Sequence, residues 1–192
     1  DFERFIDLND GDRCICFSCC RTVVVDSADA APLWANVIKF LRNHLGLPIW
    51  DGMADIPILI VGYEALNEQL QRHNCHGVAS QIMTRGLCLT DHNNLGRFRV
   101  PSLRFNTSHS IFEASNGSDR FTYYEVPKSS KANTNSTVFA IMCLSGLPRD
   151  LTASVLAHEA THAWIKMHPE FNVHKPIPPQ VEEGLAQLMA FL

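Results

Sequence analysis

The sequence predicts an α+β fold in which a twisted, mostly antiparallel sheet is accompanied by several helices. Short β-prone segments separated by polar turns occupy the middle of the chain, a pattern typical of antiparallel strands. The most β-prone of these segments, residues 137–144, is expected to be a central strand. An apolar, helix-compatible run follows it and carries the pattern H-E-x-x-H at residues 158–162.

Four helices are expected from apolar periodicity and from residues typical of helix ends. The first opens near residue 31, with Pro32 in its first turn and Gly46 as its end signal. The others cover 64–71, run from about Pro148 to Met167, and start near Gln180. The expected strands are 22–25, 56–61, 85–89, 98–105, 110–112, 120–126 and 137–144.

Length and charge exclude several classes of protein. The chain has 192 residues and a net charge of −4, so we expect no surface for nucleic acid or for an anionic membrane. No apolar run approaches the roughly 18 residues that are needed to span a bilayer. The sequence begins at Asp1 without a methionine and stops at Leu192 inside a predicted helix. We therefore expect a piece of a longer protein, truncated at its C-terminal end.

Four of the seven cysteines crowd into one short N-terminal segment, where Cys16 and Cys19 form a C-x-x-C pair. Such a cluster ahead of a cysteine-poor body is more typical of a zinc module in a reducing compartment than of a disulfide framework. The remaining ligands would lie upstream, or Cys14 and Cys20 would complete the set. The alternative is a group of free thiols at a chain terminus.

The H-E-x-x-H pattern predicts a metal site. On a helix, His158 and His162 lie one turn apart, separated by ~40° around the axis and ~6 Å along it. Both imidazoles therefore project from one face and can bind the same metal ion. Glu159 lies beside that face, where it can reach a water on the metal without binding the metal itself. Two histidines and one further carboxylate suit Zn²⁺, a combination suited to hydrolysis of peptide bonds.

The third ligand is expected on the next helix, which begins with E-E-G-L-A at residues 182–186. In sequences resembling the zinc peptidases with a glutamate as third ligand, that ligand lies on such a helix before a small residue. The resemblance points to Glu183, before Gly184, and leaves Glu182 as the alternative. Gln187, one turn on, would be a hydrogen-bond partner to a ligand. Without a metal, the two glutamates would be solvated carboxylates at a helix N-terminus.

In the expected mechanism Glu159 is the general base, which takes a proton from the zinc-activated water and returns it to the leaving amine. The strand at 85–89 is the candidate sheet edge for pairing with a substrate. A second donor to the oxyanion is usual, and the candidates are His168, His174, Tyr123, Tyr124 and Arg85.

Several stretches of the chain resemble the plant ubiquitin-activated LIM peptidases, the DA-one family and its relatives. The matches run nearly from end to end and are specific towards the C-terminus, whereas residues 91–136 are divergent. The matching stretches are C-F-S-C at 16–19, A-L-N-E at 65–68, T-R-G-L-C-L at 84–89, G-L-P-R at 146–149, L-A-H-E at 156–159, H-A-W at 162–164 and V-E-E-G at 181–184.

The resemblance implies a zinc endopeptidase with a zincin fold of the gluzincin type, located in the cytoplasm with the nucleus as a second compartment. It implies that residues 1–26 end a LIM-like module in which Cys16 and Cys19 bind a structural zinc ion, and that 27–192 form the peptidase domain. Activation by ubiquitin or ubiquitin ligases and growth-regulatory or ubiquitin-pathway protein substrates are also implied. The alternatives are a catalytically silent, zinc-stabilised scaffold and an aminopeptidase; the intact Glu159 favours an active enzyme.

Overall fold

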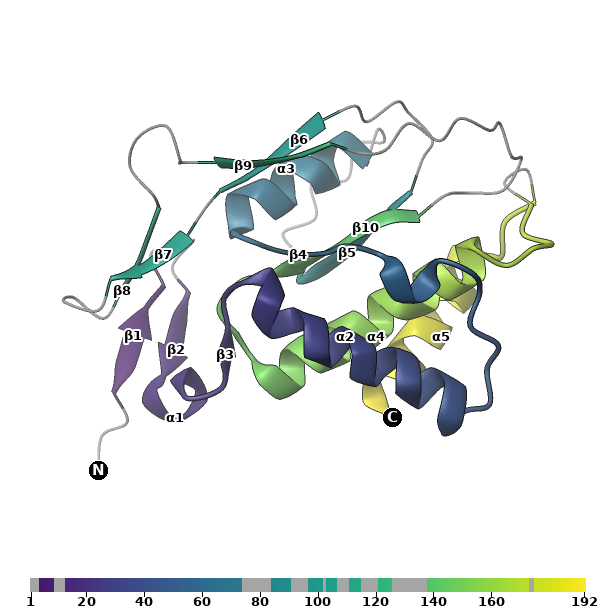
Figure 1. Cartoon of the computed structure of the whole chain (residues 1–192), viewed down its shortest axis with the longest axis horizontal. Coiled ribbons are helices and arrows are strands. Elements are labelled where there is room, and N and C mark those ends of the chain that lie inside the picture. Colours follow the sequence, from purple (N-terminus) through teal and green to yellow (C-terminus); the bar gives the residue numbers. More distant parts are fainter. Residues whose placement is uncertain are drawn as a thin grey trace.

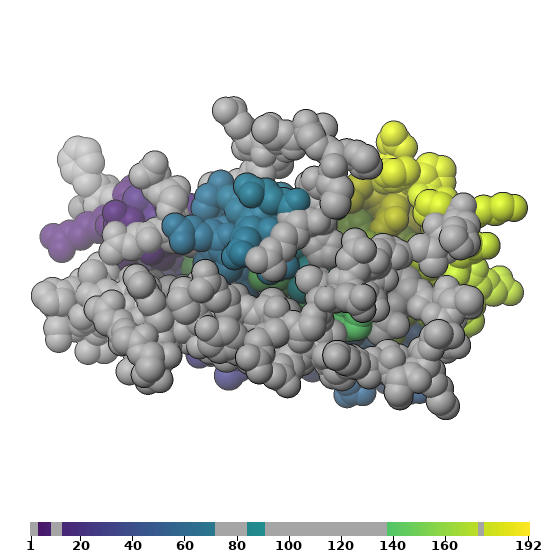
Figure 2. All heavy atoms as spheres, turned by 90° about the horizontal axis from the view of Figure 1, so that it is seen from above, coloured from purple at the N-terminus to yellow at the C-terminus, as the bar shows by residue number. Residues whose placement is uncertain are grey.

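The computed structural model describes residues 4–8, 13–73, 84–90, 97–101, 103–106, 111–114, 121–125, 138–172 and 175–192. Their helices and strands form a mixed α/β arrangement, compatible with the predicted α+β class. A small central sheet separates α3 (Tyr63–His73) from α2 (Ser27–Asn43) and α4 (Arg149–Lys166), and α5 (Pro179–Phe191) packs against α4 (Figure 1). Figure 2 looks onto the α3 side, with the N-terminal and C-terminal segments at opposite ends. In the described part of the chain, no helix combines the length and apolar character that crossing a bilayer requires.

The central sheet has β10 (Val138–Leu144) between β4 (Ile58–Val61) and β5 (Gly86–Thr90). The predicted central strand is confirmed, and every residue of β10 except Phe139 is buried. Because helices cover both faces of this strand, it is apolar along its length instead of alternating with polar residues. β5 pairs with β10 in antiparallel fashion, whereas β4 runs parallel to it.

The prediction of one mostly antiparallel sheet is only partly right. The parallel β4 was not foreseen because alternation of apolar residues reports which face of a strand is buried and not the direction of its neighbour. The remaining described strands are antiparallel but form separate pairs: β1 (Phe5–Asp7) with β2 (Cys14–Cys16), β3 (Val23–Val24) with β11 (Leu147–Pro148), β6 (Arg97–Pro101) with β9 (Phe121–Glu125), and β7 (Leu103–Asn106) with β8 (Ile111–Ala114).

The start of α2 differs from the prediction. The helix begins at Ser27 because the Asp26 carboxylate accepts a hydrogen bond from the Asp29 N–H at 2.8 Å, which caps the first turn. Pro32 consequently lies inside the helix and not in its first turn, so that part of the prediction is wrong. Gly46 follows the helix end with φ +66°, a conformation in which glycine carries no steric penalty, as predicted.

α4 has nearly the predicted bounds, and it is the best-enclosed helix of the site. Ala160 and Ala163 have no exposed surface, so neighbouring elements approach the helix closely. Two indole rings connect its last turn to the loop after α2. Trp50 and Trp164 stack with their ring centroids 5.7 Å apart. Trp164 Nε1 donates to the Pro48 carbonyl and Trp50 Nε1 donates to the Trp164 carbonyl, both at 2.7 Å.

Hydrogen bonds connect the N-terminal segment, which contains the β1–β2 hairpin and β3, to the turn that precedes α4. The Arg13 guanidinium donates to the Ser145 carbonyl, and the Gly146 N–H donates to the Val24 carbonyl at 2.9 Å. Gly146 has φ +78°, and a Cβ on it would lie 2.7 Å from Leu8. Both the backbone conformation and the close approach therefore favour glycine at this turn.

Two thiols of the central sheet, Cys88 and Cys143, are buried, and burial raises the pKa of each to about 12. Only about one such thiol in ten thousand is ionised near pH 8, and the thiolate is the reactive form. We expect both to resist an alkylating reagent in the folded protein and to react after unfolding in denaturant. Peptide mass spectrometry measures the labelling, with the exposed Cys14 of the metal-free protein as the reactive control. Equal labelling of Cys88 and Cys14 in the folded protein would contradict this expectation.

Candidate metal centre

α4 presents two histidines from one face. The Nε2 atoms of His158 and His162 are 3.2 Å apart, and their ring centroids are 5.0 Å apart. His162 is buried, while His158 is partly exposed. Burial and the nearby His162 lower the pKa of His158, which keeps its imidazole in the neutral form that binds metals. The predicted pairing of these two side chains on one helix face is therefore present.

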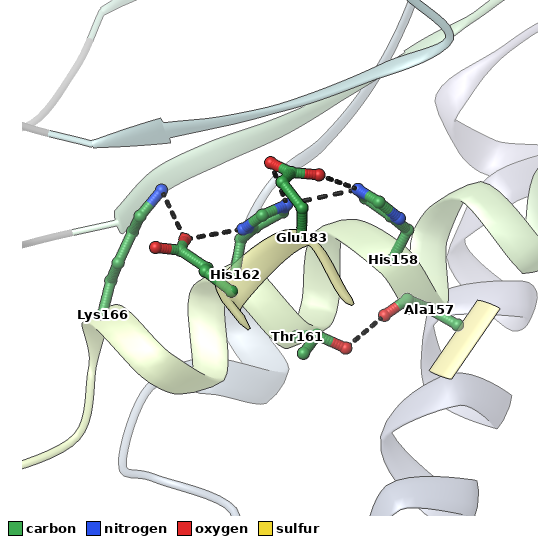
Figure 3. A network of polar contacts seen from close by, with 7 residues as sticks. Ala157, His158, Thr161, His162, Lys166 and Glu183 are labelled. Carbon is green, nitrogen blue, oxygen red and sulfur yellow. Dashed lines mark hydrogen bonds and ion pairs between the residues drawn. The ribbon is translucent and has the colours of Figure 1, made fainter. Parts of the chain in front are cut away.

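α5 brings a carboxylate to the same point (Figure 3). The Glu183 oxygens lie 3.4 Å from Nε2 of His158 and 3.5 Å from Nε2 of His162. The ligand atoms of the three residues all lie within 4.8 Å of one another, and no other group of three or more such side chains converges in the described ranges. The Glu183 side chain is 64% exposed, so the point of convergence is open to solvent.

The spacing of the two imidazole nitrogens fits a tetrahedral zinc ion, and a different oxygen of the Glu183 carboxylate lies near each nitrogen. Bonds of about 2.0–2.1 Å at tetrahedral angles place neighbouring ligand atoms about 3.3 Å apart. The two Nε2 atoms are 3.2 Å apart, close to that value; Oε2 of Glu183 lies 3.4 Å from His158 Nε2, and Oε1 lies 3.5 Å from His162 Nε2. Two nitrogens and one carboxylate oxygen also match the donor set of hydrolytic zinc sites, in which the fourth position stays open.

The adjacent glutamate has a different position. Glu182 accepts a hydrogen bond from Nδ1 of His162 at 2.7 Å, and Lys166 Nζ lies 3.5 Å from the same carboxylate oxygen. The hydrogen bond from His162, followed by the charge of Lys166, lowers the pKa of Glu182. An ionised carboxylate only accepts hydrogen bonds, so it fixes the proton of His162 on Nδ1 and leaves Nε2 with a lone pair that can bind a metal.

Glu159 lies between α4 and β5, and it is only 6% exposed. Burial raises the pKa of its carboxyl to about 7, although the Cys88 N–H donates a hydrogen bond to it. A cleft of about 390 Å³ is lined by Glu159 together with His158 and Glu183. A buried carboxyl whose pKa is near neutrality, next to a candidate metal site, is suited to accept and release a proton.

The other sequence-predicted residues are distributed differently. Gln187 and Arg85 line the same cleft. His168 is not among the residues that line it and packs edge-on against Trp50, with ring centroids 4.9 Å apart. Its Nδ1 accepts a hydrogen bond from the Glu170 N–H at 3.1 Å. The remaining oxyanion candidates cannot be placed, since the side chains of Tyr123 and Tyr124 on β9 and all of His174 lie outside the described residues.

The cysteine pair lies where β2 passes into the short helix α1 (Phe17–Cys20). The Cys19 N–H donates to Sγ of Cys16 at 3.4 Å, so the two residues form a tight turn. In the part of the chain that the structure describes, no third histidine, cysteine or carboxylate joins them in a ligand group. Zinc binding by Cys16 and Cys19 stays a prediction.

Sequence reasoning missed the interaction between Glu182, His162 and Lys166. One signal was available, because Lys166 follows His162 by one helical turn and therefore shares its face. The distance between α4 and α5 was not available from the pattern, and that distance decides which ring nitrogens each of the two adjacent glutamates meets.

Fold and site together define a mixed α/β protein with a candidate His–His–Glu metal centre on two packed helices. The chain belongs to the DA1-like family, whose model, described as Protein DA1, matches residues 51–192. This confirms the resemblance inferred from the sequence.

Several curated relatives match almost the whole chain. Protein DA1 of Arabidopsis thaliana is 31% identical over 188 residues, which cover 97% of this chain and 31% of that protein. Protein DA1-related 1 of the same plant is 29% identical over 191 residues, and the LIM domain-containing protein HDR3 of Oryza sativa subsp. japonica is 28% identical over 195 residues. The chain spans 30–33% of the length of these relatives. No protein of known structure matches it significantly.

We expect Glu182→Gln to weaken zinc binding by about 10- to 100-fold, because the amide no longer holds the His162 ring as an ionised acceptor does. Glu183→Gln should weaken binding further, since it changes a ligand atom itself. Competition with a chromophoric chelator measures both affinities. Glu64→Gln, at an exposed position of α3, is the matched control and should bind zinc like the wild type. Equal affinity for Glu182→Gln and the control would contradict the assigned role.

Proposed function

We propose that the chain forms the zinc-binding part of an endopeptidase with a zincin fold of the gluzincin type. The observation that carries this proposal is the convergence of His158, His162 and Glu183, whose ligand atoms lie within 4.8 Å of one another, beside the buried Glu159. A structural metal site would need no ionisable group held out of solvent next to it. A proton acceptor in that position is what a hydrolytic site requires.

The roles of the side chains follow from their positions. His158, His162 and Glu183 would hold the ion, which when bound lowers the pKa of a water toward ~7 and polarises the scissile carbonyl. Glu159 would accept a proton from the attacking water and donate it to the leaving amine. Burial raises the pKa of this carboxyl to about 7 in the metal-free chain, and the positive charge of a bound ion would lower it and favour the ionised form that accepts the proton. Glu182 and Lys166 keep the His162 ring in the orientation and tautomer that the ion needs.

The substrate chain would pair with β5. Among the strands that the structure describes, this one is at the edge of the central sheet beside β10, and its first residue, Gly86, lines the cleft that contains Glu159. An exposed strand edge offers backbone donors and acceptors to an extended peptide whatever its side chains are. Arg85, just before β5 and exposed in the same cleft, is the candidate second donor to the oxyanion.

The wider context is proposed from the family. A relative whose name contains LIM domain supports a LIM-like module around Cys16 and Cys19 with its own structural zinc ion. Activation by ubiquitin or ubiquitin ligases, growth-regulatory or ubiquitin-pathway substrates, and a cytoplasmic location with the nucleus as a second compartment rest on the resemblance. They concern the whole, longer protein.

Glu159→Gln tests the proposed reaction. The amide has the shape of the carboxylate but cannot accept the proton, so we expect hydrolysis of an unfolded protein substrate to fall by about 10²- to 10⁴-fold. Zinc affinity should stay unchanged, because Glu159 is not a ligand in this assignment. The assay compares the zinc-loaded wild type and variant in the full-length, ubiquitylated protein, with a chelator as the blank. Equal rates, or no cleavage by either protein, would favour the silent scaffold.

Zinc content tests the N-terminal site separately. If Cys16 and Cys19 bind a structural ion, the double variant Cys16→Ser/Cys19→Ser should contain one equivalent of zinc less than the wild type, while a His158→Ala/His162→Ala variant should lose the other ion. Elemental analysis of the desalted protein measures both. An unchanged zinc content in the cysteine double variant would eliminate this second site.

A further inference from the structure

Gly86, the first residue of β5, lies against the Glu159 side chain. A Cβ built on Gly86 would be 2.5 Å from Oε1 of Glu159, 2.8 Å from its Cγ and 2.7 Å from Cγ1 of Val155. Non-bonded carbon atoms are most stable about 3.5–4.0 Å apart, so contacts this short are repulsive. Any side chain at position 86 would have to displace Glu159, Val155 or the strand.

The backbone does not account for this glycine. The described glycines with positive φ are Gly46, Gly52 and Gly146, and Gly86 is not one of them. An L-residue can therefore adopt the backbone conformation at position 86, and space is the reason for glycine there. Gly184 on α5 is the opposite case, because nothing lies within 4 Å of a Cβ at that position.

The same strand also binds the glutamate directly. Two residues after Gly86, the backbone N–H of Cys88 donates a hydrogen bond to the Glu159 carboxylate. β5 thus contacts this carboxylate at two residues. Gly86 leaves space for the side chain, and the Cys88 N–H donates a hydrogen bond to it. The group is 6% exposed, so its surroundings are mainly protein and not solvent.

We propose that Gly86 is a positioning residue for Glu159. The missing side chain lets the carboxylate lie against β5, bonded to the Cys88 N–H and within the cleft that His158 and Glu183 also line. The inference rests on the proposed function, since it concerns the residue to which that function gives the proton transfer. Gly86 acts through the glutamate and touches no reacting atom.

A double-mutant cycle in thermal unfolding tests the contact without any assay of activity. Gly86→Ala is made in the wild-type chain and in a Glu159→Ala chain, and the Tm of each metal-free protein is measured. We expect Gly86→Ala to lower the Tm by about 5 °C in the wild type, as overpacking does in a domain of this size. The decrease should be clearly smaller in the Glu159→Ala chain, where only the contact with Val155 remains.

Gly184→Ala is the matched control, because it makes the same chemical change in open space. It should leave the Tm unchanged or raise it slightly in both chains. Equal decreases for Gly86→Ala in both chains would overturn the inference. If Gly86→Ala alone does not fold, recovery of folded protein in the double variant supports the contact, and a double variant that fails while Glu159→Ala folds overturns it.

Enzyme kinetics of the Gly86→Ala variant distinguish a displaced Glu159 from a general loss of structure. In the zinc-loaded protein, Gly86→Ala should lower kcat by about 100-fold, with a much smaller change in KM and none in zinc affinity, because a misplaced base affects chiefly the chemical step. An unchanged kcat would overturn the inference. If the zinc-loaded wild type cleaves no peptide, the proposed peptidase function fails, and the unfolding cycle still decides whether Gly86 fixes the position of Glu159.

Discussion

The packing of α5 against α4 is the contact on which the candidate metal centre depends. His158 and His162 are neighbours in any α-helix, but Glu183 reaches them only because a second helix lies close by. Ala186, which has no exposed surface, permits the close approach, and the Ser154 hydroxyl donates to the Ala190 carbonyl at 2.8 Å across the two helices. Without this packing, the carboxylate of Glu183 would not lie within reach of the two imidazoles.

The same packing places polar side chains of α4 and α5 in apolar surroundings, where they form hydrogen bonds. Thr161 donates to the Ala157 carbonyl at 2.9 Å, and His162 donates to Glu182 (Figure 3). A buried polar atom without a partner costs roughly 1–3 kcal/mol, so this pairing is a condition for a stable helix here. In the described residues, Oε1 of Gln69 is the one buried side-chain atom without a hydrogen bond, and it lies on α3, on the other side of the sheet.

The parts of the molecule that local chemistry decides could be predicted from the sequence. The helix around His158 follows from an apolar run bounded by Pro148 and Pro169, and the histidine spacing follows from helix geometry. β10 follows from its β-branched and apolar residues, and its burial on both faces explains why they are uninterrupted.

What could not be predicted are distances between segments far apart in the chain. The parallel direction of β4 depends on how β10, which follows it by more than seventy residues, is aligned in the sheet, and periodicity does not report this. The division of roles between Glu182 and Glu183 depends on the depth at which α5 packs on α4. The need for glycine at position 86 depends on a carboxylate more than seventy residues later in the chain.

The pairing of β3 with β11 determines where this protein can be divided for recombinant work. Val24 is 4% exposed and belongs to the main hydrophobic core, although it precedes α2. A fragment that starts at Ser27 would strip the partner strand from Leu147 and Pro148 and open a void under the first turn of the histidine-bearing helix. A fragment for expression should therefore start upstream of Phe5. It then keeps the β1–β2 hairpin and the hydrogen bonds that connect the N-terminal segment to the turn at Gly146.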